Sequence, residues 1–509
     1  MGDRRSQPLL RAAIGGLLAG FAPAAAGPWL MVPALALLWS VVDRQRLAAG
    51  WGLIAVLISH RWLLALHPLT WMGVPGPLSL PIAISIWLFC GVCAALLLCC
   101  WSLLAKLLLR LRPIRLELGG AFWCVSVLAC LWGLVEVWLS SGPLFWIGVG
   151  GSALPADPAL AGLGRWIGAG GLAAVQLILG WGLWAAVAGR RFLPWGGVIV
   201  TSFVVLHGLG AASLPSIRES SGSLVLAAWQ SAIPTREKFN VERQRRLPAL
   251  IRDALRQAEA MDAKALVVPE GTLPPRGGLA VPEEGIPLLG GGFRWVRGEQ
   301  RSSLLLHAST GGSDAVLLDK HRLVPLGEAL PTLPLGMLSG LSAVGGLHPG
   351  TPSRFFDGFD PPGGAAICYE ISDGRALAAA TASGARWLLA IANLDPYPVL
   401  LQDQFLALAQ LRAIETGRDL LSVANTGPTA MIRGDSRVEL LLAPEVGGVA
   451  RAEVQLRSEQ TFYVRWREGP LLAVLLMALI GWSRPFSGYG RDSCAAEGGG
   501  GKHPPGEAG

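Results

Sequence analysis

The sequence predicts a polytopic α-helical membrane domain of about eight transmembrane helices joined to an external α/β domain. Of its 509 residues, 52% are apolar, only 15% are charged and 20 are tryptophan. Low charge with abundant tryptophan is typical of membrane spans that carry aromatic residues at their ends. Long apolar runs fill residues 1–215, whereas residues 222–465 alternate strand-length apolar runs with polar, helical stretches. A chain of this length exceeds one ordinary domain, so we interpret the two parts as separate units.

Seven apolar stretches in the first part each approach the roughly 20 residues that a membrane-spanning helix needs. A shorter run, PLLAVLLMALIGWSR, follows at 470–484. The seven stretches are 8–26, 28–42, 48–66, 80–104, 119–139, 162–187 and 192–212. We therefore predict a membrane domain over 1–215 with seven transmembrane helices and a C-terminal transmembrane helix over 469–485. The low-complexity residues 486–509 are predicted to form a disordered cytoplasmic tail.

Basic residues occupy alternate loops of the helical part. They precede the first span and follow the second, fourth and sixth, whereas the loop HPLTWMGVPGPLS contains neither lysine nor arginine. Because basic loops stay in the cytoplasm, this pattern predicts a cytoplasmic N-terminus and an external α/β domain. The start, DRRSQPLLRAAIGGLLAGFAPAAAG, also fits a cleaved signal peptide. We prefer an uncleaved helix, because its removal would leave six spans and spoil the charge alternation.

Seven apolar runs between 222 and 465 have strand length: SLVLAAW, ALVVPEG, SLLLHAS, AVLLDKH, AAICYEI, WLLAIAN and LLSVANTG. Residues 242–260 and 400–418 are predicted to form helices. The second repeats apolar positions every three or four residues and ends at Gly417 and Arg418. Strands interleaved with helices indicate α/β layers, and about 240 residues suffice for one core.

The cysteines divide between the two parts of the chain. Six of the eight lie in the apolar N-terminal half, Cys494 lies in the tail, and Cys368 is alone in the predicted α/β domain. The spacing of Cys90 and Cys93 fits a zinc or redox pair, but both lie inside a long apolar run. We therefore expect no metal site, and we expect Cys368 to be a free thiol.

Three segments place reactive side chains at the ends of predicted strands. ALVVPEGTLP carries Glu270, LLDKHRLVPLGE carries Lys320 and Glu328, and AICYEISDG carries Cys368. The carboxyl ends of strands are where α/β folds place reacting groups. Each residue alone has an ordinary reading as a packing or surface residue, but their joint occurrence favours one site.

These residue types suit nucleophilic catalysis by a thiol. A free thiol is mostly protonated at neutral pH, so Cys368 needs a base, and Glu270 could accept its proton. The Lys320 ammonium and the backbone N–H of Tyr369 could stabilise a tetrahedral oxyanion. A Cys–His pair using His321 or His348 is an alternative.

Taken together, the motifs resemble the apolipoprotein N-acyltransferase family of the carbon–nitrogen hydrolase (nitrilase) superfamily, which uses a Glu-Lys-Cys triad in this order. VPEGTLP is similar to the family's Pro-Glu-Ser motif, DKHRLVPLGE to its lysine motif, and ICYE to its nucleophile motif. LRAIETGRDLLSVANTGPTAMI is similar to a later stretch of the family. Glu136, followed by SGPLFWIGVG, resembles the family's intramembrane glutamate and the segment after it.

The resemblance implies a nitrilase-type αββα sandwich for the catalytic domain, 222–465. It implies Glu270 as general base, Lys320 as oxyanion stabiliser and Cys368 as nucleophile. The supporting residues that it implies are Glu328, Tyr369 and Glu370. The implied reaction moves an acyl chain from a phospholipid, through a Cys thioester, to the N-terminal α-amine of S-diacylglyceryl-cysteine in lipoproteins.

The resemblance also implies the setting of the reaction. It implies a multi-pass protein of the bacterial inner membrane with its catalytic domain on the periplasmic side. The expected partners are a phospholipid donor, a diacylglyceryl lipoprotein acceptor and the bilayer. We expect no cofactor, no metal and no nucleic acid.

The chain departs from the family pattern at several positions. Val268 stands where tryptophan is usual, Phe239 stands near an expected tryptophan, and the loops NLDPY and ISDGRA differ from the family's. These loops leave open a membrane-tethered amidase that uses water as the second nucleophile. A transporter or lipid-binding scaffold is the alternative outside enzymes. For the apolar segment 328–346 two interpretations stay open: an arm that dips into lipid, or an ordinary buried connection between the Lys320 and Cys368 motifs.

Overall fold

The structure is a computed structural model. It describes residues 6–72, 74–111, 118–188, 192–214, 220–235, 241–273, 285–307, 315–325, 327–329, 346–395 and 397–483.

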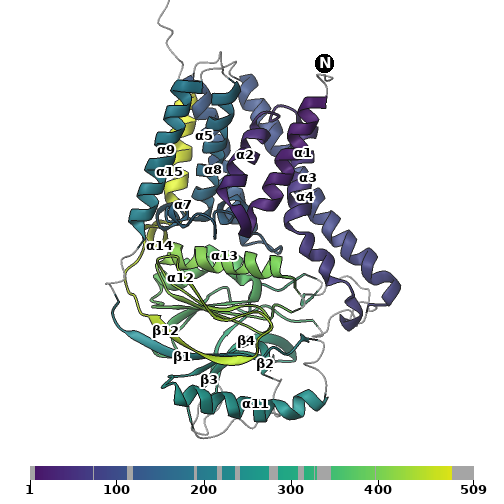
Figure 1. Ribbon diagram of the computed structural model, residues 1–509, viewed down its shortest axis with the longest axis vertical. Helices are drawn as coiled ribbons and strands as arrows, with labels where there is room; N and C mark the ends of the chain where they lie inside the picture. The colour runs from purple at the N-terminus through teal and green to yellow at the C-terminus, as the bar shows by residue number, and fades with distance from the viewer. Residues whose placement is uncertain are drawn as a thin grey trace, which may run out of the picture.

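The molecule has a bundle of apolar helices that stands on an α/β domain (Figure 1). The N-terminal helices and the final helix share the bundle, because α15 packs beside α5 and α8. The bundle helices are α1 (Ser6–Phe21), α2 (Pro28–Trp39), α3 (Gln45–Ser59), α4 (Gly76–Leu111), α5 (Leu118–Ser140), α8 (Gly164–Ala188), α9 (Phe192–Ser213) and α15 (Gly469–Ser483). Each predicted span therefore coincides with an apolar helix.

The lengths of these helices differ from the prediction. Within the described ranges, five helical segments are long and apolar enough to cross a membrane, whereas α2, α3 and α15 have 12, 15 and 15 residues. At 1.5 Å per residue, 15 residues extend only about 22 Å, which is less than the hydrocarbon core of a bilayer. A 3₁₀ segment, Arg61–Leu66, continues the path of the chain after α3. Composition predicted the positions of these helices but overestimated their lengths.

Glu136 of α5 has a structural task inside the bundle. Its Oε1 accepts hydrogen bonds from the Val149 backbone N–H at 2.7 Å and from the Trp132 indole at 2.9 Å. Its Oε2 accepts one from the Gly150 N–H at 3.1 Å. Glu136 thus binds the first N–H groups of the short helix α6 (Gly148–Gly151), which have no partner within the helix.

In the described residues of the α/β domain, the strands form two six-stranded mixed sheets. The first has the order β12-β1-β2-β3-β4-β5, and β1, β2 and β3 are parallel. Its strands are β1 (Ser223–Gln230), β2 (Leu266–Leu273), β3 (Leu288–Val296), β4 (Glu299–His307), β5 (Ala315–Asp319) and β12 (Gly448–Gln455). The second has the order β11-β10-β9-β8-β7-β6, and β7, β8 and β9 are parallel. Its strands are β6 (Phe355–Phe356), β7 (Gly363–Ile367), β8 (Leu388–Ala392), β9 (Leu420–Ala424), β10 (Thr429–Ile432) and β11 (Val438–Leu442).

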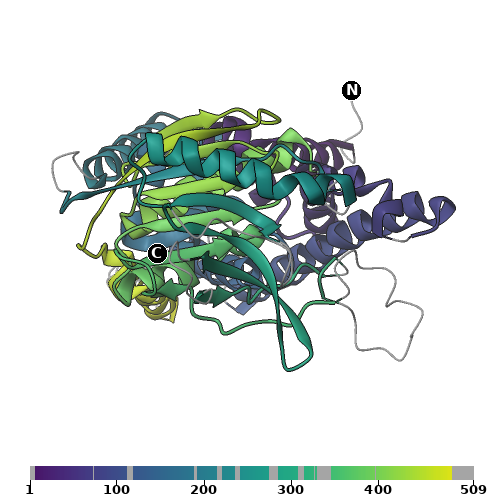
Figure 2. The ribbon, with the colours of Figure 1, turned by 90° about the horizontal axis from the view of Figure 1, so that it is seen from below.

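The two sheets pack face to face between two helical layers, as the αββα expectation requires. Strand β2 contacts β8 and β9 of the other sheet, and every residue of β7, β8 and β9 is buried. Helices α12 (Gly374–Ala382) and α13 (Val399–Thr416) lie between the second sheet and the bundle. Helix α11 (Val241–Ala260) covers the far side of the first sheet, and the view from below shows it lying across that face (Figure 2).

Local patterns predicted only part of the secondary structure of this domain, since the helices α12 and α14 (Phe462–Trp466) were not expected. Both expected helices form, and α13 ends at Gly417, whose φ of 65° gives the left-handed cap that glycine favours. Strand β7 ends at Ile367, so AAICYEI is a strand only in its first three residues. Of the described strands, β3, β6, β10, β11 and β12 were missed. Glycine or charged residues weaken the strand pattern of β3, β11 and β12, whereas β6 and β10 have only two and four residues.

Candidate active site

The two sheets bring Glu270, Lys320 and Cys368 to one place. Glu270 lies in β2 and Lys320 directly follows β5, both in the first sheet, whereas Cys368 directly follows β7 in the second. All three are buried, with 6%, 0% and 9% of their surface exposed. Burial of two charged groups in one place demands that they pair.

Lys320 provides the pairing. Its Nζ donates hydrogen bonds to Oε1 of Glu270 at 2.8 Å and to Oε1 of Glu328 at 2.7 Å. The second oxygen of Glu328 accepts the Val324 backbone N–H at 3.0 Å, and that of Glu270 accepts the Asn393 backbone N–H at 3.3 Å. One ammonium thus lies between two carboxylates, each of which also has a backbone donor.

Cys368 occupies a strained turn. Its φ is +56°, a left-handed value that costs a non-glycine residue about 1–3 kcal/mol. The turn begins the 3₁₀ segment Cys368–Ser372 and ends the strand abruptly. The backbone N–H of Tyr369 hydrogen-bonds to the Cys368 sulfur. Such strain persists only where the surrounding structure enforces it, and it is frequent at functional sites.

The electrostatics keep the resting thiol protonated. Burial and the Glu270 carboxylate raise the pKa of Cys368 well above its usual value; Lys320 opposes this shift and Glu328 adds to it. Burial disfavours the charged form of Lys320, but the two carboxylates outweigh it and raise its pKa. Burial also raises the pKa of Glu328, which brings that carboxyl closer to accepting a proton. The cluster therefore needs a base to produce a thiolate, and it contains carboxylates able to act as one.

Glu370 points away from this chemistry and holds the backbone. Its two oxygens accept hydrogen bonds from the backbone N–H groups of Ile367, His321 and Arg322, at 2.9, 2.7 and 3.0 Å. They also bind Arg354, which sequence reasoning missed. No local pattern marks Arg354, because its partner lies 16 residues away.

Tyr369 connects the turn that begins at Cys368 to the membrane part. Its phenol donates to the carbonyl oxygen of Pro143, and its ring stacks on Phe145 with centroids 6.4 Å apart. The Arg322 guanidinium lies 5.1 Å from the same ring. Burial raises the pKa of Tyr369 to about 12, so the phenol stays a neutral donor.

The segment Ser140–Phe145 covers the turn from the membrane side. Ser372 Oγ donates to the Ser140 carbonyl at 3.0 Å, and Arg322 donates to the Gly142 carbonyl. Tyr397 from NLDPY is half-buried, and its ring centroid lies 5.7 Å from that of Trp62. The sequence drew attention to SGPLFW and NLDPY but assigned no contact to either.

The remaining candidates have structural tasks. His321 hydrogen-bonds to the Gly350 carbonyl at 2.8 Å, and His348 lies 3.6 Å from Glu299, so both histidine rings are engaged away from the thiol. In ISDG, Asp373 caps α12 by accepting the Ala376 N–H at 3.1 Å.

A buried charged pair of α13 contacts the membrane part through Glu415. Arg412 and Glu415 form a buried pair at 2.9 Å. Glu415 also accepts the Ala169 N–H of α8 at 2.7 Å. A Cβ at Gly374 would lie 1.5 Å from Arg412, so this glycine is required by packing. The divergent ISDG loop is thus explained by a helix cap and a close contact.

Three predicted features lie outside the described residues. They are most of the apolar segment 328–346, Phe239 and the tail 486–509.

The fold and the site define the class of the protein: an αββα domain with a buried Glu–Lys–Cys cluster, carried by a bundle of apolar helices. No protein-family model matches the chain. It is 60% identical to an apolipoprotein N-acyltransferase of Parasynechococcus marenigrum, over 91% of this chain and 98% of that protein. It is 53% identical to an apolipoprotein N-acyltransferase of Prochlorococcus marinus (strain MIT 9313), over 94% and 97%. The chain belongs to the apolipoprotein N-acyltransferase family.

A solved structure of Saccharomyces cerevisiae Nit3, a member of the nitrilase superfamily, is also similar. It has 14% sequence identity and a TM-score of 0.35, and the match covers 47% of this chain and 93% of that one.

Proposed function

We propose that this protein transfers an acyl chain from a phospholipid to the N-terminal α-amine of S-diacylglyceryl-cysteine in lipoproteins. The observation that carries the proposal is the position of Cys368. It sits at a strained strand end, beside the Glu270–Lys320–Glu328 cluster and beneath Ser140–Phe145 of the membrane part. Membership of the family supports the acyl acceptor.

The first half-reaction loads the cysteine. Glu270 takes the proton of the Cys368 thiol, and the thiolate attacks the ester carbonyl of a phospholipid. The Lys320 ammonium and the Tyr369 N–H stabilise the resulting oxyanion. The C–O bond then breaks, the leaving lysophospholipid oxygen takes the proton from Glu270, and a thioester remains on Cys368.

The second half-reaction releases the chain. The neutral α-amine of the acceptor attacks the thioester and gives one proton to Glu270. The C–S bond breaks, Cys368 leaves as a thiolate that regains this proton, and an amide forms. The lysophospholipid leaves before the acceptor amine reacts with the thioester, so the cycle is ping-pong.

The contact with the membrane part supports a lipid donor. A thioester survives only if water is excluded, and Tyr369, Phe145 and Trp62 form an aromatic cover on the membrane side of the turn. The alternation of basic loops supports an inner-membrane protein whose catalytic domain, residues 222–465, faces the periplasm. Labelling of a cysteine introduced at the exposed Glu439 by an impermeant maleimide in intact spheroplasts tests this orientation.

Complementation tests the function. Wild-type protein is expected to restore growth and lipoprotein N-acylation in a bacterium depleted of its own apolipoprotein N-acyltransferase, whereas Cys368→Ser is not. Failure of the wild type, or rescue by the serine variant at equal protein level, contradicts the proposal.

Mass spectrometry separates the transferase from an amidase. Purified protein incubated with phospholipid alone is expected to accumulate acyl-Cys368, and a diacylglyceryl peptide with a free α-amine is expected to discharge it as an amide. Discharge by water at the same rate without the peptide would instead identify a hydrolase.

A further inference from the structure

Arg354 hydrogen-bonds to residues next to the two turns that carry Lys320 and Cys368, which are called the catalytic turns below. It lies just before β6 and is 2% exposed. Its Nη1 donates to both oxygens of Glu370, at 2.9 and 2.7 Å. Its Nη2 donates to the carbonyl oxygens of Asp319 at 2.8 Å and Thr351 at 2.5 Å.

These bonds bracket Lys320 on both sides. Arg354 holds the carbonyl of Asp319, the residue before Lys320, and Glu370 holds the N–H of His321, the residue after it. The backbone at Lys320 is therefore clamped through both neighbours by one ion pair.

The same pair reaches the nucleophile. Glu370 Oε2 accepts the N–H of Ile367, the residue before Cys368, at 2.9 Å. Lys320 belongs to the end of the first sheet and Cys368 to the end of the second. A single buried ion pair thus joins the two turns that carry the ammonium and the sulfur.

We propose that Arg354 is a positioning residue for the reaction proposed above: with Glu370 it sets the separation of the Lys320 ammonium from the Cys368 sulfur. The inference rests on the proposed acyl transfer for its kinetic readout only. Arg354 does not touch the reacting atoms, and it acts through the backbone of both turns.

Stability alone is a poor explanation of this pair. Buried ion pairs contribute little net stability compared with well-packed apolar side chains, and Arg354 Nε is buried without a hydrogen-bond partner. What the guanidinium supplies is geometry: Nη1 binds both oxygens of the Glu370 carboxylate, while Nη2, held in the same plane, binds two backbone carbonyl oxygens. A lysine keeps the charge but cannot make this set of bonds.

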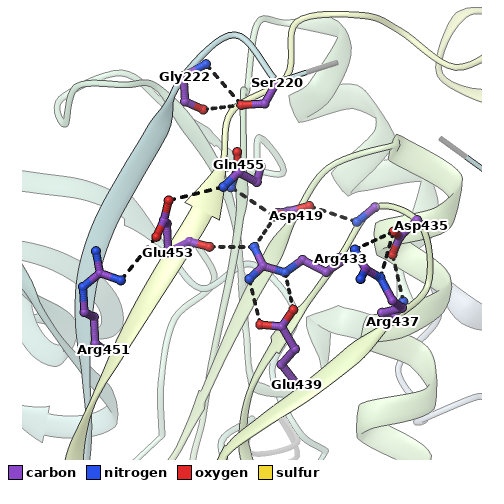
Figure 3. Close-up of polar contacts among 11 residues, drawn as sticks. Ser220, Gly222, Asp419, Arg433, Asp435, Arg437, Glu439, Arg451, Glu453 and Gln455 are labelled. Atoms are coloured by element: carbon purple, nitrogen blue, oxygen red, sulfur yellow. Dashed lines mark hydrogen bonds and ion pairs between the residues drawn. The ribbon is translucent and has the colours of Figure 1, made fainter. Parts of the chain in front are cut away.

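The domain contains a matched control. Arg433 also binds one carboxylate with two bonds, to Glu439 at 2.8 and 2.7 Å, and a backbone carbonyl, that of Glu453, at 2.6 Å (Figure 3). It also pairs with Asp419, which precedes β9, whereas the catalytic turns lie at the carboxyl ends of the parallel strands. Arg433→Lys therefore applies the same chemical change far from the site.

The experiment compares Arg354→Lys with Arg433→Lys in the full-length purified protein. Four quantities are measured: kcat and KM of acyl transfer, the pH profile of Cys368 alkylation by iodoacetamide, and the melting temperature. Arg354→Lys is expected to lower kcat at least tenfold with KM within twofold, and to shift the alkylation profile. Arg433→Lys is expected to leave kcat and the profile unchanged.

Retention of kcat within twofold and of the wild-type alkylation profile by Arg354→Lys overturns the proposal. So does an equal loss of kcat in Arg433→Lys at a similar melting temperature. If Arg354→Lys does not fold, Arg354→Gln replaces it under the same criteria. Alkylation needs no acyl donor, so a wild type that lacks acyl transfer refutes the proposed function while the alkylation profiles still test Arg354.

Discussion

Two clusters of the α/β domain each place one basic side chain between two carboxylates. At the candidate site, Lys320 lies between Glu270 and Glu328. At the other cluster, Arg433 lies between Asp419 and Glu439 (Figure 3). The charges are the same in number and sign, so any difference in behaviour must come from their surroundings.

The surroundings reverse the direction of the shifts. Lys320 is fully buried, and burial raises the pKa of Glu328 and of the adjacent Cys368 thiol. Glu439 is 45% exposed, and its hydrogen bonds to Arg433 lower its pKa. An exposed carboxylate beside a cation stays a stable anion, whereas the buried one is brought close to taking a proton. The comparison teaches that burial, and not charge count, makes a proton acceptor.

Replacement of the central cation is expected to give the largest difference in kcat between the two clusters. Lys320→Met removes the proposed oxyanion donor and leaves two buried carboxylates without their cation, so kcat is expected to fall about 10³-fold. Arg433→Met is expected to keep kcat within about twofold. Single-turnover formation of acyl-Cys368 by both folded variants is the measurement. Equal losses would show that the Lys320 cluster has no special role.

Replacing one carboxylate in each cluster should give the next largest contrast. Glu270→Gln removes the proposed base while keeping the size of the side chain, and kcat is expected to fall about 10²–10⁴-fold. Glu439→Gln makes the same change in the Arg433 cluster and is expected to leave kcat unchanged. Steady-state transfer rates of both variants decide between them, and a Glu270→Gln enzyme with wild-type kcat would exclude Glu270 as the base.

The pH dependence of Cys368 alkylation sharpens the electrostatic side of the comparison. Because the pKa of Cys368 is raised, less thiolate is present at a given pH than in a free thiol. Alkylation is therefore expected to be slow at pH 7 and still to rise with pH beyond about 8.5, the ordinary thiol value. Glu328→Gln removes a charge that raises this pKa and should move the profile to lower pH. A wild-type profile that matches N-acetylcysteine would contradict the prediction.

The smallest effect is expected for the stability of the Arg433 cluster, at its exposed carboxylate, Glu439. The pKa of Glu439 is lowered in the folded state, so its stabilisation is present above the unfolded pKa and is lost as pH falls through the folded pKa. Glu439→Gln should cost less than about 1 kcal/mol at pH 7, because solvent screens the pair. The difference in melting temperature from wild type should shrink as pH falls below about 4.3, the ordinary glutamate value, and vanish once the pH is below the lowered folded pKa. A difference that stays constant between pH 7 and strongly acidic pH would indicate a packing effect.

The sequence indicated the site through residue chemistry at strand ends. Glu270, Lys320 and Cys368 each follow a recognisable apolar run, so their common place could be inferred before their contacts were seen. Glu370 was expected to shape the site, but its bonds to three backbone N–H groups and to Arg354 join segments up to 49 residues apart. Sequence periodicity does not report contacts between distant segments, so no local pattern indicated a role for Arg354.

Local patterns alone determined where the apolar helices lie, that an α/β domain follows them, and which lysine and cysteine directly follow its strands. These are properties of residues close in the chain, where hydrophobic period and residue type suffice. Glu270 was also expected at a strand end but lies inside β2, which continues to Leu273. Tertiary structure decided what faces these residues. It placed Ser140–Phe145 over the turn that begins at Cys368, turned Glu370 toward the backbone, and buried Lys320 while leaving Glu439 in solvent. Burial depends on which distant segments pack together, and burial sets the proton affinities of the site.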